Sequence, residues 1–203
     1  GDIEFKDGAF GVIGTDKQVA LAEIAKLSYQ GGKLPRGMEP GFSASALFES
    51  AGGGTWPNGA HVVELEIDEE TGRLEMTRYS AVDDVGVVLN PLLFHGQIYG
   101  GIVQGAGQAM MEHMIYEEGT GQVLTGSFVD YAMPRADDFC HFNITNNVVP
   151  TKRNPLGVKG AGESGTCGAI PAVMNAVNDA LASIGAPEIE MPATAEKVWQ
   201  SIQ

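Results

Sequence analysis

Basic residues are scarce in this chain. Its 203 residues include 12 Lys and Arg against 26 Asp and Glu, which gives a formal net charge of −14 at pH 7. A surface that binds nucleic acid needs a basic patch or stripe. The few cations are scattered along the sequence, so we exclude nucleic acid as a partner.

Cysteines and long apolar runs are also few. The two cysteines, Cys140 and Cys167, make neither a disulfide framework nor a metal cluster, and favour a reducing compartment, so we expect a cytoplasmic location. No apolar run approaches the roughly 20 residues of a membrane-spanning helix, and no signal-peptide pattern opens the sequence. The four histidines lack metal-ligand spacing and favour surface positions, and a small buried residue is the expected role of Cys167.

Glycine, in contrast, is abundant, and it is concentrated near the end of the chain. The 28 glycines are roughly twice the usual share of about 7%. Four of them lie in Gly157-Val158-Lys159-Gly160-Ala161-Gly162-Glu163-Ser164-Gly165, before a helix expected from about Pro171. Glycine allows close approach of the backbone to a ligand, and exposed N–H groups in such a turn form a concave polar site.

Glu163 is the only carboxylate of this glycine turn. It is either a proton-transfer group or an incidental residue of a surface turn. Burial would favour its protonated form, whereas the N-terminal end of the following helix would favour the ionised form. The sequence leaves these alternatives open.

A helix with unusual glycine content is predicted from Pro91 to Met114, with Asn90 as its cap. At 100° per residue, one narrow stripe contains Gln97, Gly101, Gln104 and Gln108. Each glycine inside a helix costs about 1 kcal/mol relative to alanine, so close packing or a ligand has to compensate. The stripe is therefore either a crowded helix contact or the glutamine-lined wall of a polar pocket.

The remaining patterns predict an α+β fold of antiparallel strands with packed helices, in two lobes at 1–82 and 83–203. We expect a hairpin over 3–13, a helix after a capping box at Thr15, strands over 42–49, 62–68, 73–82 and 139–145, and helices over 169–181 and after Thr194. Asp83 and Asp84, at the boundary, either bind a cation or, as is more usual, shape a turn.

Several segments together resemble the molybdenum hydroxylase family, which includes xanthine dehydrogenase, aldehyde oxidase and carbon monoxide dehydrogenase. The matching segments are Glu66-Ile67-Asp68 with Thr71-Gly72-Arg73, Asp84-Val85-Gly86 with Asn90-Pro91, 96–112, Tyr131, Pro134, 159–163 and Asn175-Ala176. They follow one another in the order of the C-terminal part of the large, molybdopterin-binding subunit, and they are most similar to the bacterial type.

The resemblance implies a role for each residue of the turn. In that family the glutamate corresponding to Glu163 lies beside molybdenum and acts as the catalytic base. The glutamine that contacts the cofactor matches Gln97, and Lys159, Gly160, Ala161 and Gly162 would bind the cofactor. No residue of this chain would ligate the metal directly, because the pterin, expected in its cytosine dinucleotide form, holds the molybdenum.

The resemblance also implies an oxidoreductase that hydroxylates an aldehyde, an N-heterocycle or a similar small substrate with oxygen from water. The expected partners are the remainder of the large subunit and subunits that carry iron–sulfur clusters and FAD. Since such subunits are much longer than 203 residues, we expect this chain to hold half of a cofactor cleft, and to lack metal and turnover alone. The alternatives are a non-catalytic assembly module and a binding domain for another phosphorylated ligand.

Overall fold

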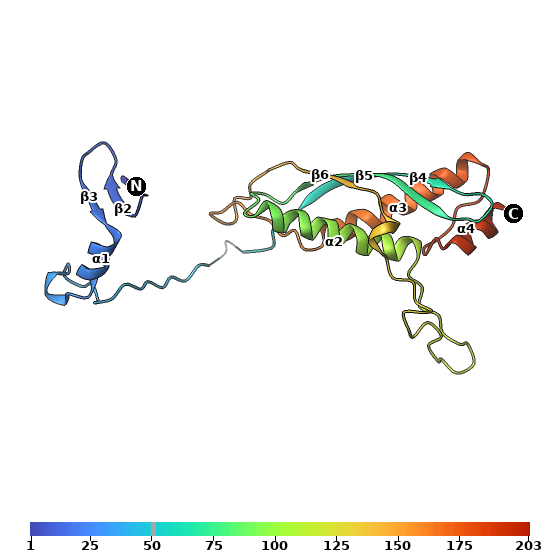
Figure 1. Cartoon of the computed structure of the whole chain (residues 1–203), viewed down its shortest axis with the longest axis horizontal. Helices are drawn as coiled ribbons and strands as arrows, with labels where there is room; N and C mark the ends of the chain where they lie inside the picture. Colours follow the sequence, from blue (N-terminus) through green and yellow to red (C-terminus); the bar gives the residue numbers. More distant parts are fainter. Residues whose placement is uncertain (50–51) are drawn as a thin grey trace. The chain divides into compact units, whose positions relative to one another are not determined.

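The computed structural model describes residues 1–49 and 52–203, and the chain divides into two compact units, 1–49 and 50–203 (Figure 1). This division differs from the expected boundary between residues 82 and 83. Strand β5 runs from Leu74 to Asp84 and pairs with β4 as far as its last residue. The expected boundary would therefore cut through a strand in the middle of its sheet.

The first unit is a small sheet followed by short helices. Strands β1 (Ile3–Lys6), β2 (Ala9–Val12) and β3 (Gln18–Ala20) form an antiparallel sheet in the order β1-β2-β3, and α1 (Leu21–Ser28) and the short 3-10 helix η1 (Gly31–Lys33) follow. The predicted hairpin is confirmed, since Asp7 and Gly8 have φ values of 50° and 80°, as a tight hairpin turn requires.

Two other expectations for this unit are wrong. The Thr15 hydroxyl donates to the Val12 carbonyl and accepts from the Lys17 amide, so it closes a turn instead of capping a helix. Residues 18–20 pair with β2 as strand β3, so helix α1 begins only after them. Residues 42–49 form no strand, because this stretch has no hydrogen-bonded neighbour among the described residues.

The second unit is a three-stranded sheet covered by helices. Strands β4 (Asn58–Ile67), β5 (Leu74–Asp84) and β6 (Phe142–Asn146) have the order β4-β5-β6. The predicted β4–β5 pair is antiparallel, whereas β6 runs parallel to β5, so the sheet is mixed. The α+β class is confirmed. The helices are α2 (Pro91–Met110), α3 (Ser164–Ser183) and α4 (Ala195–Ile202), with the 3-10 helix η2 (Ala136–Asp138) before β6.

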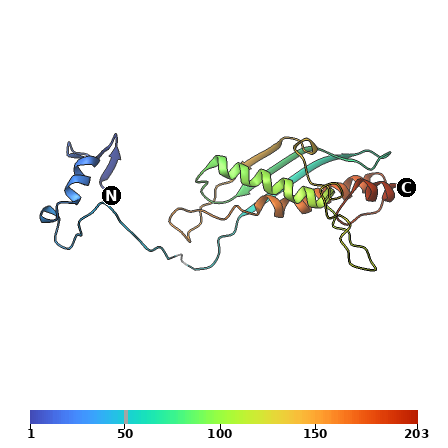
Figure 2. The same ribbon diagram turned by 60° about the horizontal axis from the view of Figure 1, so that its bottom comes forward.

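Helices α2 and α3 lie side by side along one face of this sheet (Figures 1 and 2). Their buried side chains form the core together with Tyr79 and Phe142 of the sheet; the helix residues are Ile98, Ile102, Ala106, Val173, Val177 and Leu181. The caps expected at Asn90 and Thr194 are both present, each accepting from the backbone amide three residues on. None of the described helices is both long enough and apolar enough to span a membrane.

The helix after the glycine turn begins at Ser164, seven residues before the expected Pro171, which lies inside it. Proline removes one helical hydrogen bond, but packing against α2 outweighs this loss. A Cβ on Gly101 would lie 3.0 Å from the Thr166 nitrogen, and one on Gly165 would lie 2.5 Å from the Ile98 carbonyl oxygen. Glycines at these positions therefore allow two helices to meet backbone to backbone, and this contact fixes where α3 starts.

Candidate functional site

A cleft of about 720 Å³ opens at the N-terminal end of α3. Its wall comes from the beginning of β4, the end of β5, the glycine turn and the first two turns of α3. The lining residues used below are Trp56, His61, Asp83, Gly160, Gly162, Glu163 and Cys167. Three of the six residues predicted for the site, Gly160, Gly162 and Glu163, therefore share one cavity.

Glu163 is the N-cap residue of α3, and its side chain is exposed to this cleft. Its carboxylate accepts no hydrogen bond from residues 52–203, not even from the helix that it precedes. A helix N-terminus carries partial positive charge and favours a negative group within the first turn. The structure thus presents an open carboxylate at a helix end, which is a suitable arrangement for accepting a proton from a bound molecule.

Gln97 reaches the same turn from α2. Its Nε2 donates a hydrogen bond of 2.6 Å to the Gly162 carbonyl oxygen, and two turns further along α2 the Thr166 hydroxyl lies 3.2 Å from Gln104 Oε1. Gln97 is not among the residues that line the cleft. The structure favours the crowded helix contact, because Gly101 and Gly105 pack against α3, and Gln97 and Gln104 bond to the turn and to α3 instead of lining the cleft.

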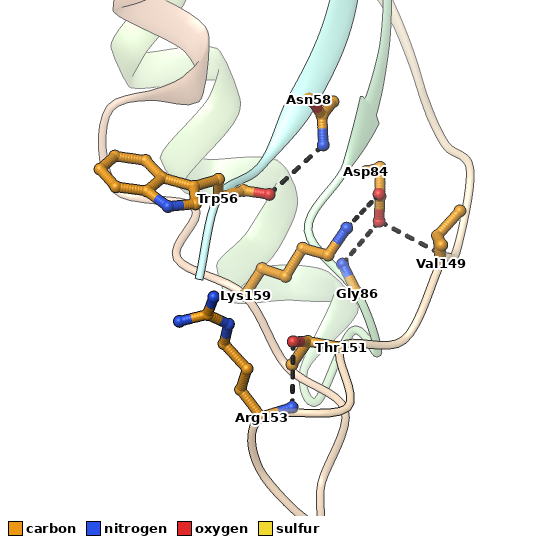
Figure 3. Close-up of polar contacts among 8 residues, drawn as sticks. All are labelled: Trp56, Asn58, Asp84, Gly86, Val149, Thr151, Arg153 and Lys159. Atoms are coloured by element: carbon orange, nitrogen blue, oxygen red, sulfur yellow. Dashed lines mark hydrogen bonds and ion pairs between the residues drawn. The ribbon is translucent and has the colours of Figure 1, made fainter. Parts of the chain in front are cut away.

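Lys159 points away from the cleft. Its ammonium group donates to Asp84 Oδ2, and the side chains of both residues are only 10% exposed (Figure 3). Asp84 Oδ1 accepts from the amides of Gly86 at 2.9 Å and Val149 at 3.1 Å. Burial raises the pKa of Asp84, but the hydrogen bonds from Lys159 and the two amides outweigh it, so the pKa lies below its ordinary value. Lys159 thus ties the glycine turn to β5.

The other residues of the turn also differ in whether they pack against the protein or stay open. Ala161 packs against the core of the unit, whereas a Cβ on Gly160 or Gly162 would meet nothing within 4 Å. Neither glycine has a positive φ, so neither is required by backbone conformation. Their missing side chains leave the backbone accessible to a ligand.

A buried polar cluster, His61, Tyr79 and Asp83, lies at the sheet side of the cleft. The Tyr79 hydroxyl is 2.6 Å from His61 Nδ1, and both Asp83 oxygens are 3.4 Å from His61 Nε2. Burial, and then the charge of Asp83, raises the pKa of Tyr79, so the phenol keeps its proton. The Tyr79 hydroxyl, the two nitrogens of His61 and the Asp83 carboxylate thus form one hydrogen-bonded chain.

Sequence reasoning missed this cluster. His61 was expected on the surface, but its side chain is 3% exposed. The signal was present in the strand, because His61 shares the inward face of β4 with Val63, Leu65 and Ile67 at a spacing of two. Asp83 and Asp84 are both buried at the end of β5, and the predicted turn role holds for Asp84, whose Oδ1 accepts from the Gly86 amide two residues on.

Cys167 was expected to be buried and is instead exposed on the cleft wall, one helical turn after Glu163. Among residues 1–49 and 52–203, no group of three or more His, Cys, Asp or Glu side chains is placed to hold a metal ion.

The second unit is thus an α+β unit with an exposed carboxylate and a glycine-framed cleft at the end of a helix. Residues 1–140 match the molybdopterin cofactor-binding domain family, and the chain belongs to this family. The molybdenum hydroxylase resemblance of the sequence is thereby confirmed.

Relatives with assigned names match over nearly the whole chain. The sequence is 39% identical to the nicotine 6-hydroxylase large subunit of Paenarthrobacter nicotinovorans over 97% of the chain and 24% of that protein. It is 34% identical to the carbon monoxide dehydrogenase large chain of Hydrogenophaga pseudoflava over 100% of the chain and 25% of that protein. The chain thus spans about a quarter of the length of these relatives.

Solved structures give the same result. A Cu,Mo-containing carbon monoxide dehydrogenase matches with a TM-score of 0.86 and 35% identity, over 98% of the chain and 25% of that protein. Quinoline 2-oxidoreductase from Pseudomonas putida 86 matches with a TM-score of 0.87 and 34% identity, over 100% and 26%. The chain corresponds to the molybdopterin-binding portion of a molybdenum hydroxylase large subunit.

Proposed function

We propose that this chain forms one wall of the catalytic cleft in a molybdenum-dependent hydroxylase, with Glu163 as the base that accepts a proton during turnover. The supporting observation is the position of Glu163. Its carboxylate is exposed on the cleft at the N-terminus of α3, and it is not engaged by residues 52–203. A carboxylate of purely structural importance would be expected to cap the helix or to pair with a cation.

The residues around Glu163 fit a large polar cofactor. The backbone is open at Gly160 and Gly162. Ser164 Oγ is buried at the cleft wall without a hydrogen-bond partner among the described residues, as expected of a group that pairs with a ligand or a water molecule. Gly160, Ala161 and Gly162 would approach the cofactor through their backbone, and Gln97 would fix the Gly162 carbonyl from the opposite side.

When bound, the molybdenum–pterin group, which we propose to be the cytosine dinucleotide form, would supply the centre that accepts the electrons of the substrate. The chain's own contribution is positional and electrostatic. The helix end places positive partial charge beside Glu163, and the hydrogen bond from Gln97 holds the bend immediately before it. A base positioned in this way raises the reaction rate roughly 10²- to 10⁴-fold.

The substrate and partner assignments belong to the same proposal. The named relatives include a nicotine hydroxylase and a quinoline oxidoreductase, so we propose a small N-heterocycle or aldehyde as the substrate. Relatives are named as large subunits or as a subunit of a complex. On this basis the remainder of the large subunit and subunits with iron–sulfur clusters and FAD are the proposed partners, in the cytoplasm.

Glu163→Gln in the complete, cofactor-loaded enzyme tests the proposal. The amide keeps the shape of the side chain but cannot accept the proton, so turnover should fall by roughly 10² to 10⁴ while molybdenum and pterin content stay unchanged. Glu118→Gln, at an exposed position in the loop between α2 and η2, is the matched control. Undiminished turnover in Glu163→Gln would support the rival role, a non-catalytic assembly module. Isolation of a different phosphorylated ligand from the complete protein would support a third role.

A further inference from the structure

Two consecutive acids, Asp83 and Asp84, end strand β5, and both are buried, at 2% and 8% exposure. Burial of a carboxylate costs several kcal/mol unless the charge is paired or hydrogen-bonded. Neighbouring side chains of a strand point to opposite faces. The two acids therefore contact different parts of the chain. Asp84 contacts Lys159 of the segment that carries Glu163, and Asp83 contacts His61 of β4, which packs against that segment at Gly168.

Asp84 holds the segment before Glu163. It pairs with Lys159, which precedes Glu163 by four residues, and its other oxygen accepts from Gly86 and Val149 (Figure 3). The backbone reinforces the same contact, since the Lys159 amide donates to the Val85 carbonyl at 2.8 Å. The start of the turn is thus fastened to the end of β5 by both side chain and main chain.

Asp83 holds the segment after Glu163 through His61. The imidazole lies between Asp83 and α3, where a Cβ on Gly168 would come within 2.5 Å of the ring. A Cβ on Gly59 would likewise lie 2.2 Å from Asp83 Oδ1. Glycines at these two positions allow the carboxylate, the ring and the helix to pack in direct contact.

We propose that Asp83 and Asp84 act as a pair of positioning residues that fix both ends of the segment 159–168 and thereby place Glu163 at the cleft. Asp84 acts through Lys159, and Asp83 acts through His61 and Gly168. Neither acid needs to touch the reacting molecule. This inference rests on the proposed role of Glu163 and adds the residues that set its position.

The contacts of Asp83 and Asp84 matter because the rate of a reaction depends strongly on the position of its catalytic base. A displacement of about 1 Å caused by a change remote from the chemistry can cost about 10²-fold. An exposed carboxylate on a glycine-rich bend has little side-chain packing of its own. The position of Glu163 therefore depends on the Gln97 hydrogen bond to Gly162 beside it and on the contacts at the two ends of its segment.

The test uses the complete, cofactor-loaded enzyme with five variants: Asp84→Asn, Lys159→Met, Lys159→Arg, Gly168→Ala and Asp137→Asn. Asp137 is an exposed acid outside the cleft and serves as the control. Amide hydrogen exchange of 159–168 is measured together with kcat, KM and the pH dependence of the rate. Gly168→Ala probes the His61 side without a change of charge.

Loss of a charged hydrogen bond should speed exchange in 159–168 by about tenfold or more in Asp84→Asn and Lys159→Met. Their kcat should fall by up to about 10²-fold with KM little changed, and the pH profile should keep its shape because Glu163 is still present. Lys159→Arg keeps the charge and should recover part of the loss. Gly168→Ala should reproduce the effect from the other end of the segment, and Asp137→Asn should match the wild type.

Normal exchange in 159–168 in folded Asp84→Asn and Gly168→Ala would overturn the proposal, as would faster exchange with undiminished kcat. If Asp84→Asn does not fold, the comparison of Lys159→Met with Lys159→Arg and the Gly168→Ala variant decide the outcome. Failure of the proposed function is recognised separately, because it appears as full turnover in Glu163→Gln. In that event the rate measurements no longer test the positioning role of the two acids. Amide hydrogen exchange of 159–168 still tests the contacts at the ends of the segment.

Discussion

Gln97 Nε2 donates a hydrogen bond of 2.6 Å to the carbonyl oxygen of Gly162, which joins the middle of one helix to the bend that precedes the other. The two residues are 65 positions apart in the sequence. Because Gly162 immediately precedes Glu163, this bond restricts the backbone at the residue that we propose as the base.

Gln97→Leu should therefore weaken the bend while it leaves the helix intact. A hydrogen bond between uncharged groups contributes about 0.5–1.5 kcal/mol to the free energy of unfolding, and we expect a loss in this range. Gln108→Leu is the control, since Gln108 lies exposed on the same stripe of α2. Urea unfolding monitored by circular dichroism measures both variants, and equal losses would show that the Gln97 bond contributes nothing specific.

The glycines of α2 should separate into two classes. A Cβ on Gly105 would lie 2.8 Å from the Thr166 carbonyl oxygen and 2.9 Å from the Ala169 Cβ, whereas one on Gly100 would meet nothing within 4 Å. Gly105→Ala should then destabilise the protein by about 1–3 kcal/mol through overpacking. Gly100→Ala should stabilise it by up to about 1 kcal/mol, because alanine favours the helix. The measurement is the sign of the change in melting temperature for each variant. A change of the same sign in both variants would contradict the packing of α2 against α3.

Sequence patterns predicted the elements whose signals are local. The patterns of 62–68 and 73–82 predicted the β4–β5 pair, and Asn90 and Thr194 marked two helix starts. The start of α3 was missed because Pro171 signals a boundary locally, while the backbone contact between Gly101 and Gly165 decides it over a long distance. Long-range contacts of this kind leave no periodic trace in the sequence.

The residues of the candidate site also divide into those with a local sequence signal and those fixed by long-range contacts. Glu163 and Gly162 could be found because glycines and an acid are concentrated in nine residues. The partner of Lys159 could not, because Asp84 is 75 positions away and its burial depends on how the sheet ends. The family resemblance implied a cofactor contact for Lys159, whereas the structure pairs its charge with Asp84.

Acid should weaken the protein partly through Asp84. The folded-state pKa of Asp84 lies below its ordinary value of about 3.9, because the hydrogen bonds from Lys159 and two amides outweigh the effect of burial. A carboxyl with a lowered pKa stabilises the fold above the unfolded-state pKa, and this stability is lost as the pH falls through the folded-state pKa. The difference in unfolding free energy between the wild type and Asp84→Asn should thus be constant above about pH 5 and shrink below about pH 4.

Urea unfolding of both proteins between pH 2.5 and 7 provides the measurement, with Asp137→Asn as the control for loss of a surface charge. A difference between wild type and Asp84→Asn that stays constant down to the lowest pH would mean that Asp84 is not held ionised by Lys159. A difference that grows on acidification would reverse the sign and exclude the assigned hydrogen bonds.

The two cysteines should differ in their reaction with thiol reagents. Cys167 is exposed on the cleft wall, whereas Cys140 is half-buried and burial raises the pKa of its thiol. Because the thiolate is the reactive form, iodoacetamide at pH 8 should label Cys167 well before Cys140, as read by peptide mass spectrometry. Since Cys167 lies one helical turn from Glu163, its alkylation should also reduce turnover of the complete enzyme. Cys167→Ser should remove the sensitivity while it keeps activity, and inactivation that persists in this variant would place the sensitive thiol elsewhere.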